Sequence, residues 1–329
     1  MLEKISLEVG CFGKLPLSPE FIRVNAKGSA LQAFDQWLQE GLHGYRTSTG
    51  PNWIQDYLQS ETWNFLFHDP GGSECLVGVV TPNQDKAGRG FPMSIFLRIE
   101  ATEFAGKIQK VPVYFQTFLA RAKQMVEEGW KDHSLQEFRE QISGWEIPDP
   151  GNWDSLDRLF QEFLGAYSMN ELLHLCGVQK DLFLSVDLKV HMQERVRAMV
   201  TAHRPTNPSK GGQLMSFPLI HDPALPFEIP FWMEYLKKYE SLTFAYPILF
   251  WNKSPQNSHA VVFLQNAPVS PKSFAKLIHP LLAIEPYWPL VSESRASDED
   301  DQGGDVFPQM ISPDSSFPEE QETLEGLLR

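Results

Sequence analysis

The sequence lacks the features that mark an exported, membrane-spanning or nucleic-acid-binding protein. Its 3 cysteines are far apart and odd in number, which argues against a disulfide framework and a thiolate zinc site. The first residues show no signal-peptide pattern, and the most apolar stretch, residues 242–251, is too short to cross a bilayer. The longest basic run is Lys237-Lys238, too little to bind a nucleic-acid backbone or an anionic membrane. We therefore expect a cytoplasmic protein with no nucleic-acid partner and no membrane insertion.

The sequence motifs of common enzyme and metal sites are also missing. There is no G-x-S-x-G or H-E-x-x-H motif, and the segment Gly10 to Leu15 has Leu where a P-loop needs Ser or Thr after its Lys. We expect no catalytic residue, no metal and no cofactor. An enzyme with an unrecognised site, for example a hydrolase using Asp85 and His68, is the alternative. A structural component of a larger assembly is a third possibility.

What the sequence does contain is typical of a folded core followed by an acidic end. Hydrophobic residues make up 42% of the 329 residues and aromatic residues 12%, so a globular protein is predicted. The net charge is −14, and residues 291–329 hold 11 acidic and 2 basic residues, or −9 of that total. This last segment has high charge and no apolar periodicity. We predict a disordered acidic tail over residues 291–329.

Hydrophobic periodicity predicts alternating strands and helices up to about residue 290. Residues 5–11, 75–80 and 91–99 have strand patterns, residues 31–42 have a helix pattern ending near Gly41 and Gly44, and residues 242–251 with 260–264 suggest a hairpin. S-x-x-E capping boxes occur at Ser134 and Ser168. A break near Pro150 suggests an N-terminal α/β region, 1–145, and a C-terminal α/β region, 146–290, packed as one unit. The sheet is expected to be mixed.

The strongest local feature is the loop Pro82-Asn-Gln-Asp85-Lys-Ala-Gly88-Arg89-Gly90-Phe91-Pro92. Asp85 can accept hydrogen bonds from nearby amides, and Gly88 and Gly90 permit positive φ. Asp85 and Arg89 could pair across the loop. One interpretation is a rigid surface turn with a weak, exposed ion pair. The second is a charged loop that recognises a ligand or a protein. The third is a buried pair that supports the end of the sheet.

Three segments in the same order resemble the TagF/ImpM family of bacterial type VI secretion. They are the loop segment with its preceding strand, Gly78 to Met93; the opening Gly10-Cys-Phe-Gly13-Lys14-Leu15-Pro16; and Phe34-Asp35-Gln-Trp37-Leu38. Departures from the family pattern include the first Trp of its F-x-x-W-D-x-W-L helix, which is replaced here. Pro19-Glu20-Phe21 stands where the family has G-D-F, and Asn83 replaces its Ser.

The resemblance implies a three-layer α/β/α sandwich and a regulatory rather than catalytic protein. Members of this family act as post-translational repressors of secretion-apparatus assembly, and the implied partner is a scaffold protein with a forkhead-associated domain. Candidate partner-binding residues are taken from the matching motifs. They are Lys14, Glu20, Asp35, Trp37, Asp85, Gly88 and Arg89.

Overall fold

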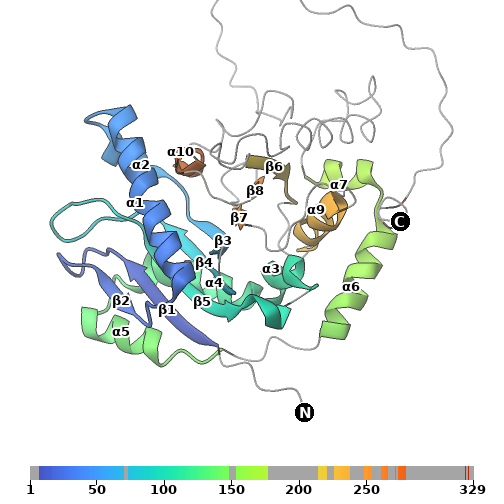
Figure 1. The fold of residues 1–329 in the computed structure, drawn as a ribbon, viewed down its shortest axis with the longest axis horizontal. Coiled ribbons are helices and arrows are strands. Elements are labelled where there is room, and N and C mark those ends of the chain that lie inside the picture. The colour runs from blue at the N-terminus through green and yellow to red at the C-terminus, as the bar shows by residue number, and fades with distance from the viewer. Residues whose placement is uncertain are drawn as a thin grey trace, which may run out of the picture.

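A computed structural model describes the larger part of the chain and has one sheet at its centre (Figure 1). The described residues are 7–69, 73–104, 106–147, 153–176, 214–220, 226–237, 248–253, 261–265, 271, 273–278, 323 and 325. The sheet has eight strands in the order β2-β1-β5-β4-β3-β7-β8-β6. Their bounds are β1 Glu8–Gly13, β2 Ile22–Val24, β3 Trp63–His68, β4 Glu74–Thr81, β5 Met93–Glu100, β6 Leu214–Pro218, β7 Ile248–Trp251 and β8 Val261–Gln265.

Helices and helical turns connect these strands. The α-helices are α1 Ser29–Thr49, α2 Trp53–Gln59, α3 Val111–Tyr114, α4 Gln116–Gln124, α5 Leu135–Ser143, α6 Trp153–Ala166, α7 Met169–Leu175, α9 Glu228–Lys237 and α10 Ser273–Ile278. Two 3₁₀ turns, Ala101–Phe104 and Ile108–Lys110, follow β5, and a π-helical turn, Met125–Gly129, extends α4. The two predicted capping boxes are present at the starts of α5 and α7.

The strands send alternate side chains to two separate hydrophobic clusters, one on each face of the sheet. In β4, Cys75, Val77 and Val79 enter one cluster, whereas Leu76 and Val80 enter the other. This follows from the two-residue period of a strand. Because both faces are buried, the central strands consist almost entirely of apolar residues.

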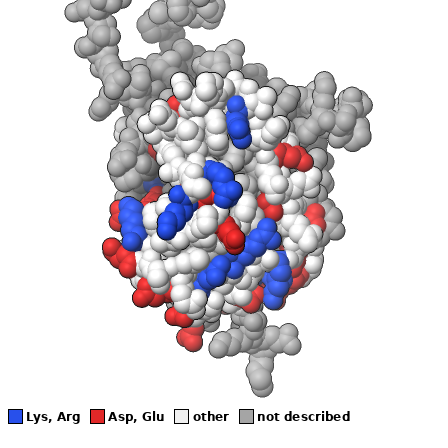
Figure 2. Space-filling model, turned by 90° about the vertical axis from the view of Figure 1, so that its left-hand side faces the viewer, with Lys and Arg blue, Asp and Glu red and all other residues white. Residues whose placement is uncertain are grey.

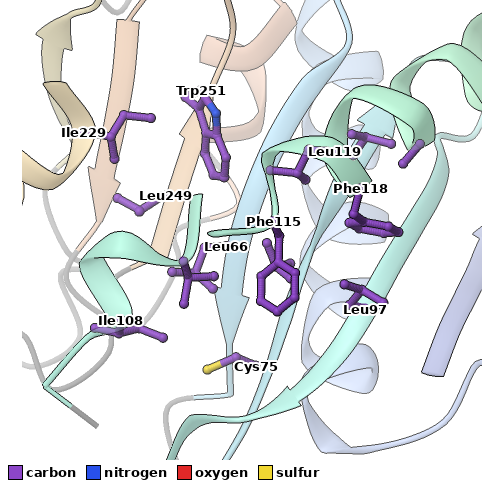
Figure 3. Close-up of a cluster of buried hydrophobic side chains, with 14 of the residues drawn as sticks. Leu66, Cys75, Leu97, Ile108, Phe115, Phe118, Leu119, Ile229, Leu249 and Trp251 are labelled. Atoms are coloured by element: carbon purple, nitrogen blue, oxygen red, sulfur yellow. The ribbon is translucent and has the colours of Figure 1, made fainter. Parts of the chain in front are cut away.

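The larger cluster lies between the sheet and the helices α4 to α7 and α9. Figure 3 shows Phe115, Phe118 and Leu119 packed near Leu66 and Leu97 of the sheet. Ile229 of α9 and Trp251 of β7 belong to the same cluster, so the segments before and after residue 145 share one core.

The second cluster is built mainly by α1 and is rich in aromatic rings. Trp37 stacks on Phe34 and on Phe250 of β7, with ring centroids 6.0 and 5.0 Å apart, and meets Phe274 of α10 edge to face at 5.7 Å. Trp37 is 4% exposed. It therefore links the helix that follows β2 to elements more than 200 residues later in the chain.

Two sequence predictions about these elements are wrong. Gly41 and Gly44 do not end the first helix, which continues to Thr49. At Gly41 the missing side chain leaves room for α10, because a Cβ there would lie 2.4 Å from the Cβ of Phe274. The sheet is also not mixed in the described residues, since every strand pairing in this part of the chain is antiparallel.

The general prediction of a sheet combined with helices is confirmed, and several finer predictions stay open. β7 pairs with β3 and with β8, so strands from both predicted regions form one sheet, while the boundaries at 145 and 290 stay predictions. Nearly all of the predicted tail, 291–329, lies outside the described residues. Within it Thr323 forms an isolated antiparallel bridge with Ser168, at the start of α7.

We predict that Trp37→Ala lowers the free energy of unfolding by about 3–5 kcal/mol, because it removes a buried aromatic ring from the second cluster. Gln36→Ala is the control, since Gln36 is an exposed neighbour on the same helix and its loss should change stability by less than about 0.5 kcal/mol. Urea unfolding followed by circular dichroism measures both. Equal effects of the two substitutions would contradict the assigned packing of α1.

Candidate functional site

The antiparallel register brings two family-like segments to one end of the sheet. Met93 at the start of β5 lies opposite both Gly13, the last residue of β1, and Thr81, the last residue of β4. Gly13 is also opposite Ile22, the first residue of β2. The segments 14–21 and 82–92 therefore leave the same end of the sheet and lie next to each other, although they are about 70 residues apart in sequence.

A buried carboxylate holds these two segments together. The Asp85 side chain has 0% exposure, and its Oδ2 lies 3.0 Å from Nζ of Lys14 and 2.7 Å from Nε of Arg89. Its Oδ1 accepts hydrogen bonds from the backbone amides of Ala87 and Arg89 at 2.9 and 3.0 Å. Both carboxylate oxygens of Asp85 are therefore satisfied by charge or by hydrogen bonds.

The environment of Asp85 stabilises its ionised form. Burial by itself would raise the pKa of the carboxyl group, but the hydrogen bonds from the Arg89 backbone, Lys14, the Arg89 side chain and Ala87 outweigh it and hold the pKa well below its usual range. The surrounding loop is closed by backbone hydrogen bonds from Asp85 to the Arg89 carbonyl and from Gly88 to the Asp85 carbonyl. The ionised carboxylate of Asp85 therefore lies inside a tight turn.

Backbone contacts add to this connection. The amide of Lys86 donates to the Ser18 carbonyl at 3.1 Å, and Nη2 of Arg89 donates to the Pro19 carbonyl. Asn83 is fixed from the other side, because its amide donates to the hydroxyl of Tyr57 in α2 at 3.2 Å. The loop at residues 82–92 is therefore held by both neighbouring segments.

Three phenylalanines and two cations cover this end of the sheet. Phe21 stacks on Phe12 with centroids 5.5 Å apart and meets Phe91 edge to face at 4.8 Å. Nζ of Lys14 lies 5.0 Å from the Phe21 ring centre, and the guanidinium of Arg23 lies 5.0 Å from that of Phe12. Phe21 keeps 37% of its surface exposed, so an apolar ring lies among cations at the surface.

The exposed part of this region forms a surface that we call the basic surface: Phe21, Arg23, Lys86 and Arg89. The last three are exposed, and the Arg89 side chain is 63% exposed even though it pairs with Asp85. Figure 2 looks onto this side of the molecule, where several Lys and Arg side chains lie near the middle with acidic side chains among them, and further Asp and Glu lie toward the rim. The sequence has no long basic run, so this patch arises only from the fold.

The structure brings together five of the seven predicted contact residues. Lys14, Asp85, Gly88 and Arg89 belong to the two joined segments, and exposed Glu20 follows Pro19 in the first of them. Gly88 has φ of +79°, as predicted. Gly90 does not have positive φ; a Cβ there would come within 2.6 Å of Ile54 in α2, so close packing explains this glycine.

The other two predicted residues lie on α1. Asp35 is half-buried and accepts a hydrogen bond from Gln39 at 2.7 Å. Trp37 is a core residue and offers almost no surface to a partner, so its place in the motif is explained by packing. Phe21 and Arg23 were not predicted as surface residues, because only the pairing of β1 with β2 places them beside Phe12.

The structure does not bring together the residues of the alternative enzyme hypothesis. His68 pairs with Cys75 at one end of β3 and β4, whereas Asp85 follows Thr81 at the other end. At about 3.3 Å per residue, the length of β3 alone separates the two side chains by more than 15 Å. Among the described residues there is also no group of three His, Cys, Asp or Glu side chains that could hold a metal ion.

A second buried charge lies far along the chain, at the start of α9. Glu228 has 0% exposure and pairs with Lys253, which follows β7. Burial raises the pKa of Glu228 to about 7, and the charge of Lys253 opposes this shift. Glu228 and Lys253 lie near Cys176, which belongs to the larger hydrophobic cluster, and neither residue is part of the basic surface.

Comparison with known proteins agrees with the motifs described above. Residues 10–144 match the family model described as the TagF N-terminal domain, type VI secretion system-associated. The match covers 135 of the 329 residues and makes this part of the chain similar to a TagF domain. This part contains Lys14, Asp85, Arg89 and the whole basic surface. No curated protein matches the chain.

One solved structure with some similarity is the crystal structure of PA0076 from Pseudomonas aeruginosa PAO1. It shares 24% identity with the aligned part, with a TM-score of 0.37, and the match covers 43% of this chain. The chain spans 64% of that protein, less than two thirds of its length. The match to the TagF family model does not depend on this limited structural similarity. None of the helices described in the structure is long and apolar enough to span a bilayer.

We predict that Asp85→Ala lowers the free energy of unfolding by about 3–5 kcal/mol, because Lys14 would be left buried without its counter-charge. Arg89→Ala should cost only about 0–1 kcal/mol, since that side chain is mostly exposed and Asp85 keeps its other partners. Asp35→Ala serves as a control carboxylate outside the cluster. Urea titrations at pH 7 measure all three.

The stabilisation by Asp85 should also depend on pH. Since its pKa in the folded protein is below the ordinary value of 3.8, the stabilisation is complete above pH 4–5 and is lost as the pH falls through and below 3.8. The difference in unfolding free energy between the unmodified protein and Asp85→Ala should therefore shrink in acid. A difference that stays constant from pH 7 to pH 3 would show that the carboxylate charge is not the source of the effect.

Proposed function

We propose that this protein is a cytoplasmic, post-translational repressor of type VI secretion that acts by binding another protein of the apparatus. The observation that carries the proposal is the TagF match over residues 10–144, the part of the chain that builds the basic surface. The family's association with type VI secretion supports a role in that system. The exposed basic surface supports action by binding another protein. The three-layer arrangement implied by the family is part of the proposal, supported by the two clusters on opposite faces of the sheet.

The geometry of the basic surface favours binding over catalysis. Its charged anchor, Asp85, is fully buried and already engaged by two cations, so it is not free to exchange a proton or to attack a substrate. The groups that do face solvent are Phe21 and the cations around it. Aromatic and Arg side chains such as Phe21, Arg23 and Arg89 are enriched at protein interfaces.

The proposed partner is a scaffold protein with a forkhead-associated domain. The resemblance to the TagF/ImpM family supports this choice. The contact residues that we assign are Phe21, Arg23, Lys86 and Arg89, with Glu20 at the edge of the surface. Lys14 and Asp85 support this surface from beneath.

The repressor proposal predicts opposite effects of loss and excess. In a host whose secretion apparatus is active, deletion of the gene should raise the amount of secreted effector protein, and overproduction should lower it. Immunoblots of culture supernatants from the two strains measure this directly. Equal secretion in both strains would refute the repressor role.

The assigned surface predicts a charge-dependent loss of binding. Lys86→Glu should weaken capture of the scaffold protein about tenfold, because it places a negative charge where the proposed partner contributes negative charge, and like charges across an interface repel. Arg158→Glu, an equal reversal on exposed α6, is the matched control and should leave capture unchanged. Both variants should melt at the temperature of the unmodified protein. Normal capture by a folded Lys86→Glu protein would show that the partner binds elsewhere.

A further inference from the structure

The basic surface has exposed positive charge that the described residues do not neutralise. Within the part of the chain that the structure describes, neither Arg23 nor Lys86 forms an ion pair with a carboxylate. Arg89 shares Asp85 with Lys14, so this buried group carries one positive charge in excess. Glu20 is the one exposed carboxylate in the segments 14–23 and 82–92. These two segments therefore carry three exposed cations and one exposed anion.

The chain itself contains a segment with the complementary charge. Residues 291–322 contain ten acidic residues and one basic residue, a net charge of −9. Five of the carboxylates lie within Asp298 to Asp305, and Val306-Phe307 follows directly. Carboxylates followed by an aromatic residue complement a surface of cations around an exposed Phe ring.

The two places where this segment joins the described fold allow it to reach the basic surface. On one side the fold ends with α10, which packs against Gly41 of α1, and on the other it resumes at Thr323, which pairs with Ser168. The 19 residues between Ile278 and Asp298 can span about 60 Å, and the 17 residues between Asp305 and Thr323 about 55 Å. The eight strands span about 34 Å across the sheet. The acidic cluster can therefore reach the basic surface from either point of attachment.

We propose that the acidic segment 291–322 docks on the basic surface of its own chain, through Arg23, Lys86 and Arg89. Because the segment is tethered, its effective concentration at the surface is in the millimolar range, so even weak electrostatic contacts would populate the docked state. The contact is between exposed charges and is weakened by salt. This inference rests on the proposed function only for its consequence: the segment and the partner would compete for the same surface.

Disulfide trapping in the full-length protein tests the docking without any partner. Ala87→Cys with Gly303→Cys places one thiol in the basic surface and one in the acidic cluster, and leaves every charge unchanged. Ser155→Cys with Gly303→Cys is the control pair, with the first thiol on exposed α6. Figure 1 shows α6 on the side of the molecule away from β1 and β2. The control thiol also has one tether on its side of the fold, because Thr323 pairs with Ser168, which follows α6.

The natural thiols should not interfere with this measurement. Cys11, Cys75 and Cys176 are buried and free. Burial raises the pKa of both Cys11 and Cys75 to about 12, so they carry little reactive thiolate at neutral pH.

With oxidised glutathione in low salt, we expect the 87–303 pair to close at least about tenfold faster than the 155–303 pair, reflecting a higher local concentration. Salt at about 0.5 M should remove the advantage, since it screens exposed charges. Neutralising Asp298, Glu299, Asp300 and Asp301 to the corresponding amides should also remove it. Equal rates for the two pairs in low salt would overturn the proposal, and so would crosslinking between two chains in place of crosslinking within one.

The same neutralised variant separates this inference from the proposed function. If both hold, the variant should capture the scaffold more tightly than the unmodified protein, because the competing segment no longer occupies the surface. Fast 87–303 trapping with no effect of the gene on secretion would leave the docking in place and refute the repressor role. Normal repression with equal trapping rates would refute the docking and leave the repressor role in place.

Discussion

The end of the sheet that carries the family motifs depends on one buried charge, the carboxylate of Asp85. A carboxylate with 0% exposure is stable only if its charge is compensated, and here two cations and two backbone amides compensate it. Each of these donors comes from a segment that must then lie in a fixed place. The end of β1, the turn at 85–89 and the residues around Pro19 are consequently held in one arrangement.

The contacts of Asp85 form only because the antiparallel sheet places the segments that contain Lys14 and Arg89 next to each other. Met93 lies opposite both Gly13 and Thr81, so the chain leaving β1 and the chain leaving β4 meet beside the start of β5. The order β1-β5-β4 in the sheet makes this meeting unavoidable. Burial of Trp37 and of the other α1 side chains against β3 and β7 then fixes the sheet from its opposite half.

Local patterns in the sequence predicted the local parts of this arrangement. The Asp85–Arg89 pair and the positive φ of Gly88 follow from short spacings within one loop, and so do the capping boxes at Ser134 and Ser168. The Lys14–Asp85 pair could not be predicted in this way, because the two residues are 71 positions apart and meet only through strand register. The depth of the loop could not be predicted either: its pattern fits both an exposed turn and a buried pair, and the fold places Asp85 in the interior, with 2% of the whole residue exposed.

The same limit explains the errors made for larger features. Gly41 ends a helix by its intrinsic preference, but here α10 needs the space that a side chain would take, and tertiary packing overrides the preference. A strand pattern indicates burial and not direction, so the antiparallel order of the sheet was not evident from alternating strands and helices.

Rigidity at this end of the sheet has a consequence for recognition. Side chains held in place before binding lose little conformational entropy when a partner arrives, so their contacts contribute more to affinity. Phe21 is already fixed between Phe12 and Phe91, and Arg89 is fixed by Asp85 and the Pro19 carbonyl. Such a surface attracts any matching anionic segment, whether it belongs to a partner or to the chain itself. In the two proposals made above, a partner and the ten carboxylates of residues 291–322 compete for this fixed surface, and the contacts of both weaken as salt screens exposed charges.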